Sequence, residues 1–251
     1  MTIKKILTNP EDLVKKIKVL IESSQFELAL KLLKENQKNH LDNFEFLNLT
    51  AQISLRKNNL KDGINFFKKS LNIHQNQPLV IYDLGIALSL NAQYDESLTF
   101  FDKLIALQPN NINPYIRKAI NFKKLDRLDD SINCYQKIID LEPKYIDAYI
   151  KKAELLILIG NSKAAQLLYQ HAIKIDSKNI ILYLKYGVLL NELGHIDQAL
   201  SIYKKSLEIE PNNPGALQNI GYIFKSKKRF DEAIKFLKKS VEIKADYNNY
   251  N

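Results

Sequence analysis

Apolar residues in this chain recur with the spacing of paired amphipathic helices. Within residues 180–213, apolar or small residues fall at i, i+3, i+4 and i+7 of one helix face: Tyr183, Tyr186, Gly187 and Leu190. Gly194 follows, and glycine can adopt the positive φ that commonly ends a helix. A second amphipathic segment then runs until Pro211, which cannot continue a helix. The pattern predicts two helices joined by a tight turn.

The same pattern returns every 34 residues. Seven copies in one register, without insertion or deletion, account for residues 10–247. We place their bounds at 10–43, 44–77, 78–111, 112–145, 146–179, 180–213 and 214–247. Residues 1–9 remain as an N-terminal lead-in and residues 248–251 as a C-terminal tail. The predicted domain organisation is therefore one array of equivalent helical hairpins.

Three columns of the array keep their chemistry. Position 8 is small in all copies but the first, and position 20 is small in all seven. Position 24 is large throughout: Leu33, Phe67, Phe101, Tyr135, Tyr169, Tyr203 and Leu237. Because helices approach closely only where a small residue lies at the crossing, we expect positions 8 and 20 to face each other, with position 24 beside them. One hairpin cannot bury its apolar face alone, so the copies must stack, and the fold class is all-α.

In these columns the chain resembles the tetratricopeptide repeat family, which also favours proline at position 32, as at Pro109, Pro143 and Pro211. The resemblance covers residues 10–247. It implies an α-solenoid, a right-handed superhelix of helix-turn-helix hairpins. It further implies that the first helix of each repeat lines a concave groove, into which positions 2, 5, 6, 9, 12 and 13 point.

Groove positions 5, 6 and 9 of repeats three to six carry the candidate binding residues. They are Tyr82, Ile86, Ile116, Arg117, Ile120, Ile150, Lys151, Leu184, Lys185 and Val188. An exposed apolar strip of this kind usually marks a partner site. Our hypothesis is a groove for an amphipathic or extended peptide, apolar side down, with acidic residues toward Arg117, Lys151 and Lys185. The alternative is that these columns pack against neighbouring helices or a second protomer.

Composition adds little chemistry. The one cysteine, Cys134, excludes a disulfide framework and fits a reducing, cytoplasmic compartment. Four histidines include His40 and His74 at the same repeat position, but no third metal ligand joins them. No nucleophile–base grouping and no phosphate-binding glycine loop is present. The sequence therefore predicts a protein that is not an enzyme and has no metal or cofactor. It shows neither a signal peptide nor an apolar run long enough to span a membrane.

Three functional classes remain open. The first is a non-catalytic scaffold or adaptor that binds protein or peptide. The second is the substrate-presenting repeat region of a larger bacterial glycosyltransferase-type enzyme. The third is RNA binding, suggested by the net charge of +9. Nucleic acid is disfavoured, because the groove is aliphatic and lacks stacking platforms.

The last repeat lacks a closing helix in this sequence. We therefore expect an incompletely covered apolar end at Ile234, Leu237, Val241 and Ile243. A partner, a second protomer (a homo-oligomer) or a further part of a longer protein would cover it, and the longer protein is slightly favoured.

Overall fold

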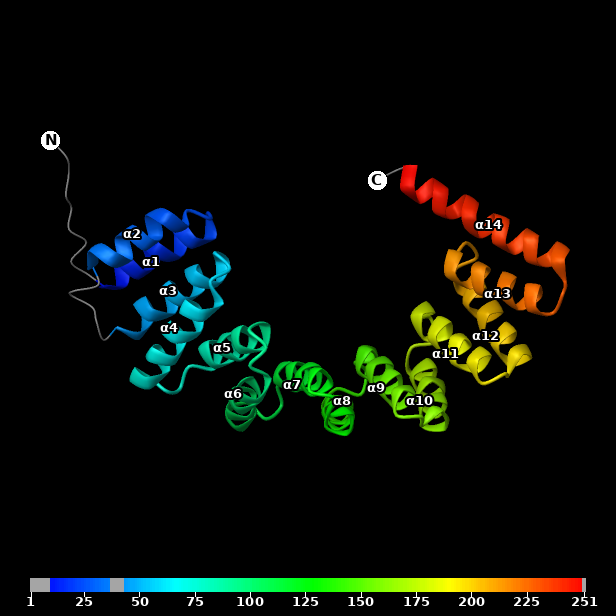
Figure 1. Ribbon diagram of the computed structural model, residues 1–251, viewed down its shortest axis with the longest axis horizontal. Coiled ribbons are helices and arrows are strands. Elements are labelled where there is room, and N and C mark those ends of the chain that lie inside the picture. Colours follow the sequence, from blue (N-terminus) through cyan, green and yellow to red (C-terminus); the bar gives the residue numbers. More distant parts are fainter. Residues whose placement is uncertain (1–9, 37–42, 250–251) are drawn as a thin grey trace. The chain divides into compact units, whose positions relative to one another are not determined.

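The computed structural model describes residues 10–36 and 43–249, and in this part of the chain every regular element is an α-helix (Figure 1). The all-α prediction is confirmed. The lead-in of residues 1–9, His40 and the last two residues of the predicted tail lie outside the described residues. The chain divides into two compact units, Met1–Arg127 and Leu128–Asn251, which we describe one at a time.

Unit 1 contains seven of the helices described. They are α1 (Pro10–Glu22), α2 (Phe26–Asn36), α3 (Phe44–Arg56), α4 (Leu60–Ile73), α5 (Pro78–Leu90), α6 (Tyr94–Leu107) and α7 (Ile112–Lys124). Unit 2 contains the other seven. They are α8 (Leu128–Leu141), α9 (Ile146–Leu158), α10 (Ser162–Ile175), α11 (Ile180–Glu192), α12 (Ile196–Ile209), α13 (Pro214–Ser226) and α14 (Phe230–Asn249).

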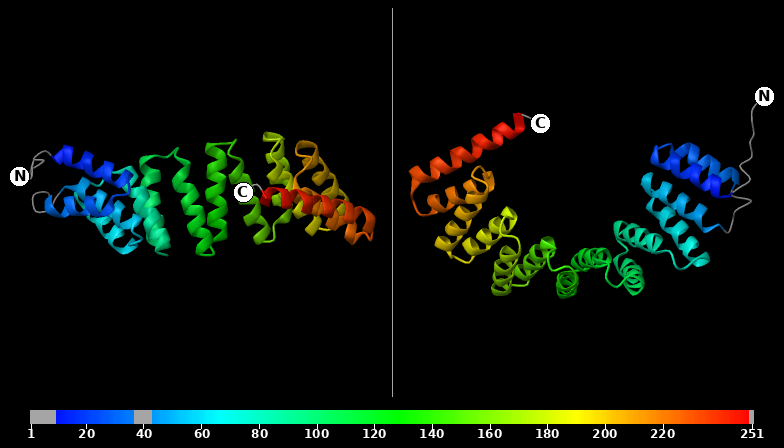
Figure 2. Two further views of the ribbon diagram at one scale, coloured as in Figure 1. Left: turned by 90° about the horizontal axis from the view of Figure 1, so that it is seen from above. Right: turned by 180° about the vertical axis from the view of Figure 1, so that it is seen from behind.

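Each odd-numbered helix begins at the first residue of a 34-residue copy. Pro78 and Pro214 hold the first helical position, where the missing N–H of proline leaves no bond unmade. Asn43, Asn111 and Asn213 precede helices and cap them by accepting backbone N–H bonds. Within each unit, the second helix of a repeat runs back beside the first (Figure 2).

The helix crossings explain why the same kind of residue recurs at positions 8, 20 and 24 in nearly every copy. A Cβ placed on Gly85 would lie 2.6 Å from Cε1 of Phe101, and one placed on Gly187 would lie 2.5 Å from Cε1 of Tyr203. Position 8 therefore lies directly under the large side chain of position 24. The predicted approach of positions 8 and 20 is also present, because a Cβ on Gly63 would lie 3.3 Å from the carbonyl oxygen of Ala51.

The turn inside each hairpin uses one backbone conformation. The residue at position 15 of every copy has a positive φ, between 57° and 79°: Ser24, Asn58, Ala92, Asp126, Gly160, Gly194 and Lys228. The expected positive φ of Gly194 is confirmed. Five of the seven positions are not glycine, so the array accepts backbone strain at this point in order to keep the hairpin geometry.

The last helix, α14, is only partly covered. Phe230, Ile234 and Val241 share one face of it and are exposed. Leu237 is half-buried, because it packs over Gly221 inside its own hairpin. Ile243 is also half-buried. The uncovered end is therefore a stripe along α14 that Leu237 does not join.

Candidate functional site

The first helices of neighbouring repeats form one continuous surface in each unit. In unit 1, Lys18 of α1, Gln52 of α3 and Asp83 of α5 line the same hollow. In unit 2, Lys185 of α11 reaches Glu154 of α9, with 2.7 Å between Nζ and Oε1. We refer to these as the first-helix surfaces of unit 1 (α1, α3, α5 and α7) and unit 2 (α9, α11 and α13).

The first-helix surface of unit 1 carries five of the predicted binding residues. Tyr82, Ile86 and Ile116 are half-buried, and Ile120 is 41% exposed. Nε of Arg117 donates to the hydroxyl of Tyr82 at 3.2 Å, and the guanidinium carbon lies 5.9 Å from the centre of the same ring. Arg117 is thus held in place by a neutral partner, and its charge remains available to an acidic group.

In unit 2 the predicted residues separate into exposed and buried ones. Val188 is 40% exposed and Leu184 is half-buried, so both present apolar area on the first-helix surface. Ile150 is only 7% exposed and belongs to the buried core cluster of unit 2. The prediction that Ile150 offers exposed apolar area to a ligand is therefore wrong, because its side chain is used for folding.

Two of the three predicted basic residues, Lys151 and Lys185, are partly neutralised by a carboxylate of the protein itself. Glu154 accepts from Lys185 at 2.7 Å and from Lys151 at 3.3 Å. Burial alone would raise the pKa of Glu154, but the hydrogen bond from Lys185 and the charges of both lysines outweigh it and lower the pKa. Lys151 and Lys185 therefore already share a carboxylate, and an acidic ligand must compete with Glu154 for them.

Sequence reasoning missed several exposed apolar residues on the same surfaces. Leu79, at 81% exposure, and Ile181 occupy position 2 of their repeats. Leu90 and Leu158 occupy position 13, and Tyr222 occupies position 9. The signal for these residues is their place in the repeat, because positions 2, 9 and 13 are groove positions in the repeat pattern. With them, the apolar strip extends in both units.

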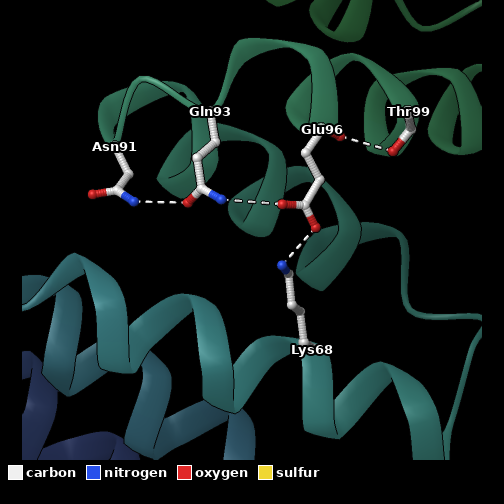
Figure 3. A network of polar contacts seen from close by, with 5 residues as sticks. All are labelled: Lys68, Asn91, Gln93, Glu96 and Thr99. Carbon is white, nitrogen blue, oxygen red and sulfur yellow. Dashed lines mark hydrogen bonds and ion pairs between the residues drawn. The ribbon is translucent and has the colours of Figure 1, made fainter.

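The second helices form a different surface. In unit 1, a hollow of about 770 Å³ lies between α4 and α6. Glu96 at its edge receives Lys68 Nζ at 2.5 Å and Gln93 Nε2 at 3.2 Å, and Gln93 in turn accepts from Asn91 (Figure 3). Each exposed pair of this kind contributes roughly 0–1 kcal/mol. The network tethers α4 to α6, and its polar groups already have partners.

The described residues contain no group of three or more His, Cys, Asp or Glu side chains that could hold a metal ion. His74, His171 and His195 are exposed, and Cys134 is buried on α8. Over the same part of the chain, no helix has the length and apolar character needed to cross a membrane.

Comparison with known proteins finds the same kind of repeat. Models of the tetratricopeptide repeat match residues 112–145, 146–179 and 190–251, which is more than half of the chain. No curated protein sequence matches it.

Three solved structures illustrate the likeness in fold. MamA has 24% sequence identity and a TM-score of 0.57, with 66% of this chain and 98% of MamA covered. YrrB, described as a TPR protein with an unusual peptide-binding site, has 19% identity and a TM-score of 0.52, with 72% and 93% covered. A tetratricopeptide repeat protein from Parabacteroides merdae ATCC 43184 has 16% identity and a TM-score of 0.61, with 93% and 92% covered. At these identities, the likeness concerns the fold alone.

Proposed function

Because the chain belongs to the tetratricopeptide repeat family, we propose that it is a non-catalytic, cytoplasmic scaffold or adaptor that binds protein or peptide segments on its first-helix surfaces. The observation that carries the proposal is the exposed apolar strip on those surfaces, including Ile120 and Val188. Neither side chain belongs to a core cluster of the described residues, and exposed apolar area gathered on one surface favours a partner. The fold neighbour YrrB is described as having a peptide-binding site, which is in keeping with this use of the fold.

The strip and the charges would contribute differently to binding. Burying the exposed part of Ile120 or Val188 would contribute about 1 kcal/mol each, taken as the exposed share of a full aliphatic side chain. An exposed ion pair contributes roughly 0–1 kcal/mol. The apolar residues therefore supply most of the affinity. Arg117 supports selection for an acidic side chain in unit 1, whereas Lys151 and Lys185 are already paired with Glu154.

A selection with a random dodecapeptide display library tests the proposal. The wild-type chain is compared with the double variant Ile120→Asp/Val188→Asp, in which each charge sits on a first-helix surface. We expect the variant to lose the selected peptides by at least about tenfold in affinity, since burying a carboxylate against apolar groups is costly.

The matched control is Leu28→Asp/Leu167→Asp. Both leucines are exposed and lie on second helices, α2 and α10. This control should fold and retain the selected peptides. Circular dichroism of both variants separates binding from folding. Peptides that bind the Ile120/Val188 variant as tightly as the wild type would refute the proposal.

A second protomer is one of the three covers expected for the exposed face of α14, and it can be tested with this chain alone. Phe230, Ile234 and Val241 are exposed there at a spacing that places them on one helix face. Sedimentation equilibrium should show self-association that Val241→Asp weakens. A wild-type chain that stays monomeric at high micromolar concentration would exclude this role for α14.

A further inference from the structure

The first-helix surface of unit 1 contains a trough that the apolar strip does not explain. Two hollows, of about 510 and about 290 Å³, share the lining residues Lys18, Gln52 and Asp83. These residues come from α1, α3 and α5, the first helices of three successive repeats (Figure 1). The trough therefore crosses three repeats. We call it the α1–α3–α5 trough.

Asp83 lies in this trough as a carboxylate without a cation. It is half-buried, and burial raises its pKa with no opposing effect from a nearby positive charge. Lys18 and Arg56 line the same hollow, but neither forms an ion pair with it among the residues described. Arg117, one repeat further in the same column, donates to the hydroxyl of Tyr82 instead. A partly desolvated carboxylate of this kind gains from a cationic partner.

A second acceptor in the trough lacks a donor for a structural reason. Nδ2 of Asn48 donates to Oε1 of Gln77 at 2.8 Å. Gln77 cannot turn around, because its Nε2 donates to the Ser70 hydroxyl at 3.0 Å and to the His74 carbonyl at 2.7 Å. Its Oε1 must therefore face Asn48, and Asn48 must present its NH₂ group to it. The network fixes the orientation of both amides.

As a consequence, one oxygen of this network has no hydrogen-bond donor. Oδ1 of Asn48 is buried and has no hydrogen-bond partner within the described chain. An acceptor in that state is destabilising until a donor reaches it. Asn48 and Asp83 line the same 290 Å³ hollow, and Glu45 lies at its edge. Lys18 and Gln52 also line this hollow, but among the described residues no hydrogen bond or ion pair joins either of them to Asn48 or Asp83.

We propose that the α1–α3–α5 trough binds the cationic side chain of an arginine or lysine in a peptide partner. The guanidinium or ammonium group donates to the Asp83 carboxylate, and a second N–H reaches the buried Oδ1 of Asn48 once the side chains that cover this atom move aside. Guanidinium offers five N–H donors in a planar fork and ammonium three, so either can serve two acceptors. The aliphatic stem of the side chain packs against Ile86, which lines the larger hollow.

This inference rests on the proposed function, because it takes the cation to arrive as part of a bound peptide. Unit 1 would then contain two binding groups of opposite charge. The trough selects a basic side chain, and Arg117 selects an acidic one. Both groups occupy position 6 of adjacent repeats, Asp83 in the third and Arg117 in the fourth.

The test uses the full chain and two small probes. Nα-acetyl-arginine N-methylamide carries the cation, and Nα-acetyl-citrulline N-methylamide is its neutral isostere. Each is titrated while the backbone amides of α3 and α5 and the side-chain amide of Asn48 are followed by NMR. We expect the arginine probe to shift these signals in a saturable way and the citrulline probe to leave them in place.

Two variants of equal charge change make the test specific. Asp83→Asn should weaken binding of the arginine probe at least about tenfold, since it removes a charge-assisted hydrogen bond. Asp95→Asn should leave binding unchanged, because Asp95 is exposed at the start of α6 and does not line the trough. Asp83→Asn should fold normally, because it removes an unpaired carboxylate without changing its shape.

Other results overturn the inference. Equal shifts with citrulline, binding that survives Asp83→Asn, or equal loss in Asp95→Asn would each exclude a cation site at Asp83. If any of these occurs while library peptides still depend on Ile120 and Val188, the trough inference fails and the proposed function stands. If library peptides bind the Ile120/Val188 variant as well as the wild type, the proposed function fails.

Discussion

Replacing Ala92 by glycine should stabilise the chain. Ala92 ends the first helix of repeat three with a φ of 58°, in the left-handed region. The hydrogen bonds of this turn are those of the turn at Gly194: Gln93 N to Leu88 O at 2.9 Å in one, and His195 N to Leu190 O at 2.8 Å in the other. The two turns therefore share a backbone geometry, and at position 15 they differ only in the methyl group of Ala92.

The magnitude follows from two opposing effects. A Cβ in the left-handed region costs about 1–2 kcal/mol. Glycine gains more freedom in the unfolded chain, which offsets about 0.4–1 kcal/mol of that. Ala92→Gly should therefore raise the free energy of unfolding by about 0.5–1 kcal/mol. Gly194→Ala should lower it by a similar amount, and no atom lies within 4 Å of the added Cβ, so the effect is one of backbone conformation alone.

Thermal melts followed by circular dichroism provide the assay. A change of 1 kcal/mol shifts the midpoint by about 2–4 °C in a chain of this size, so each variant should move it by about 1–4 °C. Ala106→Gly is the control, because Ala106 is an exposed residue in the last turn of α6, where the backbone is helical and glycine should not stabilise. A lower midpoint for Ala92→Gly, or an unchanged one for Gly194→Ala, would refute the reasoning.

Three other predictions follow from the packing and the charges. Gly187→Ala should destabilise by about 1–3 kcal/mol, measured by urea unfolding, because its Cβ would collide with the ring of Tyr203; an unchanged midpoint would mean that the ring moves aside without cost. Because the pKa of Glu154 is lowered in the folded chain, its ion pairs stabilise above the ordinary carboxylate pKa and are lost as the pH falls through the lowered value. Glu154→Gln should therefore cost about 1 kcal/mol or less at pH 7, and this cost should disappear as the pH falls through the lowered pKa of Glu154; the variant should also strengthen binding of acidic peptides at neutral pH. Burial raises the pKa of Tyr135 to about 12, so in an alkaline absorbance titration Tyr135→Phe should leave the signal below pH 11 unchanged.

The fold could be predicted well from the sequence, because a packing pattern inferred from one copy can be checked in the other six. A glycine at one position says little, but Gly85 opposite Phe101 and Gly187 opposite Tyr203 repeat one packing solution. The same reasoning was weaker at the binding surface. Ile150 shares a column with the half-buried Tyr82, Ile116 and Leu184, yet the local packing of unit 2 takes it into the core. A column predicts the direction of a side chain approximately, and burial depends on the neighbours in that particular repeat.

The trough could not be predicted from columns at all. The missing donor for Asn48 depends on Gln77, which is 29 residues away and is itself fixed by Ser70. The net charge of the basic surface likewise depends on Glu154, which comes from a different repeat than Lys185. Such features arise from the identity of particular pairs across repeats, and repeat averages conceal them.

The fixed 34-residue register has a consequence for how such a chain can change its ligand. Every first helix begins at the same position of its copy, so duplication of residues 78–111 would join equivalent backbone points. The duplicated chain would display a second Asp83 in the repeat next to Arg117, and the first Asp83 would lie one repeat further from Arg117 than before. The distance between acidic and basic groups on a bound peptide would thus become a quantity set by copy number, adjustable by recombination without altering a single side chain.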